Sequence, residues 1–314
     1  MTRHWKTFAV MCTLLWVYAI PASGQEFTVA EMADRVTTDP QKAPLVIDDV
    51  ENFIRVQSLL SSASDTLQIL QSEYLDKGTP GLKMFIEKYD LTALRLQEAI
   101  RKHPEKYSSL GDMPAGIRAY EGEMRAAFTQ LKSVIPQTVF LPTYFLVGGH
   151  RGIGSGSKEG PLITVEKWSR PIDGKTTMLI HETVHMQQVV AVGYEEYVSL
   201  FGPKKSLLGL CIREGTAEFF ANLVTGEMTQ HQAVDYLKEN ERRLWPTFVE
   251  EMHGKETGDW MWSTPKDTLQ PQHVGYVLGA FIVQAYYDNA EDKAKAVDDI
   301  LGVTDYAAFL EQSG

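Results

Sequence analysis

The sequence predicts an α+β protein that is mainly helical and contains one small sheet. Apolar residues recur at three- and four-residue spacings over most of 27–136 and again after residue 174, which is typical of helices that bury one face. Between these stretches, 138–147 is rich in β-branched and aromatic residues and is followed by two glycines. We therefore expect a helical N-terminal region, 25–136, followed by a region with strands and helices, 137–314.

The first 24 residues predict a signal peptide. Arg3 and Lys6 give a positive start, 8–20 is an uncharged apolar run, and 22–24 are small residues. The apolar run is shorter than the roughly 20 residues that span a bilayer. We expect cleavage and a periplasmic or secreted protein with no stable membrane span, while an uncleaved anchor remains the alternative.

The charge of the chain argues against nucleic acid as a partner. The chain has 41 acidic and 30 basic residues and a formal net charge of −11, whereas a protein that binds nucleic acid usually presents a basic face. Cys12 lies in the predicted signal peptide, so Cys211 would be the lone cysteine of the mature chain and is expected to be a small buried apolar residue.

Within the N-terminal region, prolines and glycines divide the helical pattern into about four helices. These breaks fall at Pro80-Gly81, at His103-Pro104 and at Pro114. We expect this region to be packing surface or a wall beside a site.

Two strands are expected next, over 138–147 and 162–166. The Gly- and Ser-rich segment 152–160 between them is interpreted as a flexible surface loop, because it leads into a strand and lacks the ending of a phosphate loop. We expect 143–147 to be an edge strand that pairs with an extended peptide.

Helical spacing then returns in several segments, separated by glycines and prolines that include Gly202-Pro203, Pro246 and Pro271. The expected helices cover 174–192, 204–223, 229–244 and 272–288, with one or two short helices over 292–310.

The helix at 174–192 carries a motif with specific chemistry, His181-Glu182-Thr183-Val184-His185. Residues four apart on a helix lie one turn above each other, so both imidazoles can bind one ion. Glu182 points to the side and is predicted to be the general base that takes a proton from water at a catalytic zinc ion.

A catalytic Zn²⁺ needs a third protein ligand. Residue 191, six after His185, is alanine, so a third histidine at that spacing is excluded. The next helix offers Glu214 and Glu218, again four apart among apolar residues. We assign Glu214 as the ligand and Glu218 as the acceptor that orients a histidine ligand, and leave the reverse assignment open.

These motifs resemble the glutamate-zincin metallopeptidases. More narrowly, 144–287 is similar to a poorly characterised bacterial family of zinc-dependent proteases with a Val-Gly turn, a Gly/Ser-rich loop, HExxH, Glu-Gly-x-Ala-Glu and Gly-Tyr-x-x-Gly. Those pieces here are Leu146 to Gly148, Gly152 to Gly156, His181 to His185, Glu214 to Glu218, and Gly275 to Gly279. The resemblance implies a twisted sheet over the motif helix, with a cleft below its edge strand, and hydrolysis of a peptide or protein substrate.

The late helix offers a proton donor for the oxyanion that amide hydrolysis generates. His273 and Tyr276 are three apart on one face. The resemblance favours Tyr276, with His273 second; the alternatives are a core aromatic residue and a surface histidine.

Two other classes of protein remain open at this point. A non-catalytic zinc-binding or peptide-binding envelope protein would need a fourth ligand to close a structural zinc site, and Cys211, one turn before Glu214, is the candidate. A helical scaffold with a fortuitous HExxH would bind no metal in stoichiometric amount.

Overall fold

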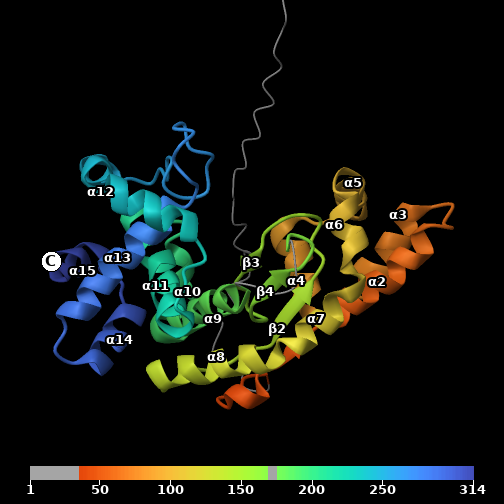
Figure 1. Ribbon diagram of the computed structural model, residues 1–314, viewed down its shortest axis with the longest axis horizontal. Coiled ribbons are helices and arrows are strands. Elements are labelled where there is room, and N and C mark those ends of the chain that lie inside the picture. The colour runs from red at the N-terminus through yellow and green to blue at the C-terminus, as the bar shows by residue number, and fades with distance from the viewer. Residues whose placement is uncertain (1–34, 169–174) are drawn as a thin grey trace, which may run out of the picture.

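The computed structural model describes residues 35–168 and 175–314, and Figure 1 shows their arrangement. The predicted signal peptide, 1–24, lies outside these residues and stays a prediction. No helix in the described ranges combines the length and apolar character needed to cross a membrane.

The N-terminal region is built mainly from short helices, and these are more numerous than predicted. Several begin at a residue whose side chain accepts a backbone N–H of the first turn, as Asp65, Thr79 and Thr92 do. The α-helices are α2 (Asp48–Leu60), α3 (Thr66–Ile69), α4 (Pro80–Tyr89), α5 (Ala93–Lys102), α6 (Pro104–Ser108), α7 (Met113–Ala119) and α8 (Glu121–Val134). The 3₁₀ segments η1 (Pro40–Lys42) and η3 (Ser109–Asp112) and the π-helical segment η2 (Leu70–Leu75) lie among them.

The later helices lie close to their predicted positions, apart from the short helix at Tyr194–Ser199, which was not predicted. They are α9 (Lys175–Val192), α10 (Tyr194–Ser199), α11 (Leu207–Thr225), α12 (His231–Glu251), α13 (Val274–Asn289), α14 (Lys293–Leu301) and α15 (Tyr306–Ser313). The break predicted at Pro246 is wrong, because this proline lies inside α12. Proline has no N–H to donate to the Arg242 carbonyl one turn earlier. Because Pro246 and Arg242 are both exposed, water can donate to that carbonyl instead.

One four-stranded sheet has the order β1-β2-β4-β3. Strand β1 (Leu45–Val46) is parallel to β2 (Thr143–Leu146), β2 is parallel to β4 (Leu162–Thr164), and β3 (Gly154–Ser155) is antiparallel to β4. The N-terminal region, expected to be helical, therefore contributes strand β1. The fold is mainly helical α+β, as predicted.

The sheet arrangement corrects two expectations. Strand β2 pairs with β4 on one side and, at Thr143 and Tyr144, with β1 on the other, so the predicted edge strand at 143–147 is a central strand. The segment 152–160, predicted to be a flexible loop, contains the edge strand β3.

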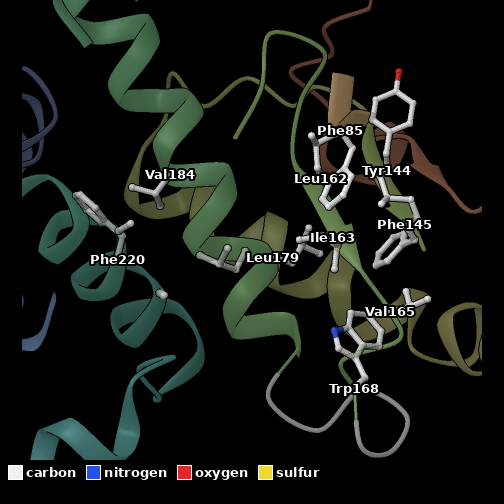
Figure 2. Close-up of a cluster of buried hydrophobic side chains, with 14 of the residues drawn as sticks. Phe85, Tyr144, Phe145, Leu162, Ile163, Val165, Trp168, Leu179, Val184 and Phe220 are labelled. Atoms are coloured by element: carbon white, nitrogen blue, oxygen red, sulfur yellow. The ribbon is translucent and has the colours of Figure 1, made fainter. Parts of the chain in front are cut away.

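Helix α9 lies between the sheet and the C-terminal helices (Figure 1). Figure 2 shows Leu162 and Ile163 of β4 on one side of α9, and Val184 directed toward α11, which carries Phe220. One apolar core runs from Ala43 to Phe309 and includes residues on both sides of residue 136. The domain boundary expected at residue 136 stays a prediction.

Candidate metal centre

Helix α9 places His181, Glu182 and His185 in the interior of the protein. All three are nearly buried, at 4%, 5% and 5% exposure. The two histidines have polar partners in Glu214 and Glu218 of α11 and in Gln188 of α9. The Nε2 atoms of His181 and His185 are 3.1 Å apart, so the two rings converge on one point.

Helix α11 brings Glu214 to the same point. Its Oε2 atom lies 3.1 Å from Nε2 of His185 and 3.5 Å from Nε2 of His181. The three side chains offer one ligand atom each, all within 4.8 Å of one another. Two imidazole nitrogens and one carboxylate oxygen form a donor set typical of catalytic zinc, so the residues present fit this ion.

Charge within this cluster also favours a cation. Burial opposes the charged form of Glu214, but the His185 and His181 rings outweigh it and hold its pKa well below the usual value. Burial likewise disfavours a charged His181, yet the Glu214 and Glu218 carboxylates raise its pKa well above the usual value. A positive charge among these donors is thus stabilised, whether a proton or a metal ion carries it.

Gln188 fixes the orientation of the His185 ring. Its Oε1 atom lies 2.8 Å from Nδ1 of His185, and its Nε2 donates to the carbonyl of Arg213 at 3.0 Å. The second bond identifies Oε1 as the atom facing His185, so Nδ1 donates and Nε2 presents its lone pair to the cluster.

Glu218 lies behind the other histidine. Its Oε1 atom is 3.1 Å from Nδ1 of His181, and its side chain is fully buried. The backbone N–H of Thr229 donates to Oε2 at 2.7 Å, and the Thr229 hydroxyl donates to Oε1. Glu218 therefore lies where a carboxylate would orient a histidine ligand, and Glu214 lies in the donor group.

Glu182 faces the edge strand. A methyl group on Gly154 of β3 would overlap Oε1 of Glu182 and lie 2.7 Å from Sδ of Met178. Burial raises the pKa of the Glu182 carboxyl. The carboxylate is outside the three-residue donor group, as the helical geometry predicts.

The two predicted proton donors are Tyr276 and His273. The Tyr276 ring stacks on the His181 ring with centroids 6.1 Å apart, and its hydroxyl accepts the indole N–H of Trp262 at 2.9 Å. His273 precedes α13 with φ 64°, and its Nδ1 lies 3.1 Å from Oε1 of Gln230. Tyr276 thus contacts a predicted ligand, whereas His273 contacts Tyr276 and Gln230.

Cys211 is apart from the donor group. Its buried Sγ contacts Sδ of Met261 at 3.7 Å. Among the residues that the structure describes, the candidate centre therefore has three protein donors, and the fourth ligand proposed for a structural zinc site is not among them.

Close backbone contact between α11 and α13 sets the depth of Glu214. A methyl group on Gly215 would overlap the Gly279 backbone, and one on Gly279 would overlap the Cys211 carbonyl. These glycines belong to the Glu-Gly-x-Ala-Glu and Gly-Tyr-x-x-Gly strings. Both strings therefore have a packing role besides the chemistry of their polar residues.

Arg213 is a further buried group beside the centre, and no sequence pattern predicted its contacts. The guanidinium carbon lies 3.8 Å from the centre of the Phe201 ring and 4.7 Å from that of Tyr197, and Nη1 donates to the Tyr197 carbonyl at 3.1 Å. Nη2 is 3.7 Å from Oε1 of Glu214, so Arg213 places positive charge behind that carboxylate.

Comparison with known proteins connects this centre to a family. Residues 151–301 match the model of a family described as "Predicted Zn-dependent protease (DUF2268)". The matched segment contains His181, His185 and Glu214. No curated protein matched the chain, and a search of solved structures also found no match.

Proposed function

From the likeness of residues 151–301 to a zinc-dependent protease family, we propose that this protein is a zinc metallopeptidase that hydrolyses peptide bonds. The observation that carries the proposal is the convergence of His181, His185 and Glu214 at one buried point. These side chains would hold the ion. When bound, Zn²⁺ would supply Lewis-acid chemistry that polarises a carbonyl and acidifies water.

The roles of the surrounding residues follow from their positions. Glu182, beside the donor group and under β3, takes a proton onto its carboxylate and returns it to the leaving amine. Gln188 and Glu218 hold the two imidazoles in place. The Tyr276 hydroxyl accepts from Trp262, which leaves its own hydrogen for a substrate oxyanion. His273 is the second candidate donor, and its ring contacts the edge of Tyr276.

A non-catalytic zinc protein is less well supported. A structural zinc site is closed by four protein ligands, whereas three converge here in the described part of the chain. The packing of Cys211 against Met261 removes the residue that favoured this alternative.

The test is the substitution Glu182→Gln. Because the amide cannot take up the proton, we expect hydrolysis of a peptide library to fall by about 10²–10⁴-fold, with zinc still bound in a one-to-one ratio. Glu195→Gln, on the exposed surface of α10, is the matched control and should leave both quantities unchanged. Equal hydrolysis by Glu182→Gln and wild type would rule out this mechanism.

A further inference from the structure

The edge strand β3 is short and has a strand partner on one side only. It pairs with β4 through Gly154 and Ser155. Across from β4, β3 approaches α9, and Gly154 permits close contact there because it has no side chain. A methyl group on Gly154 would overlap Glu182, and one on Gly156 would lie 3.9 Å from Cβ of His185. The height of β3 over α9 therefore decides how much space remains above the proposed base.

A lysine from the N-terminal region holds this strand. Lys88 lies near the end of α4, and its Nζ donates to the Ser155 hydroxyl at 2.5 Å and to the Gly156 carbonyl at 3.0 Å. Tyr89, the next residue, also hydrogen-bonds Ser155. Lys88 thus joins a helix and an edge strand that are separated by more than sixty residues in the sequence.

Helix α4 is a firm support for this contact. Thr79 caps its first turn, Pro80 is its first residue, and Phe85 packs near Gly148 at the end of β2. Helix α4 also contacts β2 and β4, so the base of the Lys88 side chain is fixed against the same sheet that β3 joins. The two hydrogen bonds of the ammonium group then connect this helix to β3.

The environment of the ammonium group is unusual for lysine. Lysine normally keeps its charged end in water, because burial of a charge is costly. Here burial lowers the pKa of Lys88 to about 8, and the charges of Glu182 and Glu214 oppose that shift. The ammonium group is therefore within electrostatic range of the proposed base and of a proposed ligand.

We propose that Lys88 is a positioning residue of the peptidase centre, which fixes β3 above Glu182 and makes α4 of the N-terminal region part of the support of that centre. The inference rests on the proposed function. It also extends the centre beyond residues 151–301, the segment that resembles the protease family.

The experiment compares Lys88→Met, which removes the charge and the donors at similar length, with Lys88→Arg, which keeps both. Lys83→Met, at an exposed position of the same helix, is the matched control. In full-length protein loaded with zinc, we expect Lys88→Met to exchange the amide hydrogens of 152–158 at least tenfold faster than wild type, with unchanged exchange in α9.

Kinetics provide the second measurement. Lys88→Met should lower kcat/KM for peptides by about tenfold, with most of the change in KM, because a displaced strand misplaces the substrate. Lys88→Arg should restore most of the loss, and Ser155→Ala, which keeps the Gly156 contact, should have a smaller effect.

Unchanged exchange over 152–158 in Lys88→Met would overturn the inference, and so would an equal effect of Lys83→Met. If the wild-type protein hydrolysed no peptide, the proposed function would fail, while the exchange measurement would still decide whether Lys88 holds β3.

Discussion

The Nδ1 atoms of the two imidazoles in the candidate centre face different chemical groups. His185 faces the neutral amide of Gln188, whereas His181 faces the carboxylate of Glu218. A carboxylate makes its histidine more basic than an amide does, so the two proposed ligands would differ in the strength with which they donate to a metal.

Removal of the amide tests this arrangement. In Gln188→Ala, the His185 ring loses the acceptor that fixes its tautomer and orientation, and we expect the dissociation constant for zinc to rise about 10–100-fold. Competition with a chromophoric chelator measures this constant. Gln68→Ala, at an exposed position in α3, is the control. Equal zinc affinity in all three proteins would mean that Gln188 has no part in holding the ligand.

Residue spacing predicted much of the centre but not all of it. His181 and His185 are one helical turn apart, and Glu214 and Glu218 repeat that spacing on α11, so their convergence could be anticipated. Gln188 is three residues after His185, and side chains three apart on a helix can touch, so this contact could also have been predicted. Lys88 had no such signal, because its contact with β3 depends on how distant segments pack.

Among the elements, α11 and α13 depend on each other most directly. Their backbones touch at Gly215 and Gly279, so neither helix can move without displacing the other. Because α11 carries Glu214 and α13 carries Tyr276, this contact also sets the distance between a proposed ligand and a proposed proton donor.

The substitution Gly279→Ala tests this contact. The added methyl group overlaps the Cys211 carbonyl, which belongs to the backbone and cannot turn away, so we expect a loss of about 1–3 kcal/mol in the free energy of unfolding. Urea denaturation of zinc-free protein measures it. Gly122→Ala, in α8 with open space around it, should keep or slightly raise stability. A Gly279→Ala protein as stable as Gly122→Ala would contradict the close contact.

The predicted end of α9 at Val192 is confirmed, whereas α11 ends two residues beyond the predicted Leu223. Helix α9 ends at Val192, before Gly193 at φ 85°, and α11 ends before Gly226 at φ 80°, a left-handed cap that glycine favours. Strands β1 and β3 were missed because two residues are too few to show alternation. Each forms only through its partner in the sheet, which a local pattern cannot reveal.

At the scale of the whole molecule, a buried carboxyl group makes stability depend on pH. Glu166 follows β4, is fully buried, and accepts the backbone N–H groups of Gly148 and His150 at Oε1. Burial raises its pKa from 4.5 to about 7. The folded protein thus binds this proton more tightly than the unfolded chain does.

The stabilising contribution of this proton is fully present below pH 4.5 and is lost as the pH rises through 7. The loss is on the order of 3 kcal/mol. We expect wild-type protein to lose this much stability relative to Glu166→Gln between pH 4.5 and pH 8. Denaturation of both proteins across that range measures the difference, in which other titrating groups cancel. If the stability of the two proteins changed equally with pH, the pKa of Glu166 would not be raised.

The sheet is assembled from both sides of residue 151, where the likeness to the protease family begins. Strands β1 and β2 lie before it, whereas β3 and β4 lie after it. A fragment excised at 151–301 would retain all three proposed metal donors, yet it would leave β4 with an unpaired edge beside Leu162 and Ile163. Such an edge invites association with other chains, so the smallest recombinant form that stays monodisperse must begin ahead of Leu45.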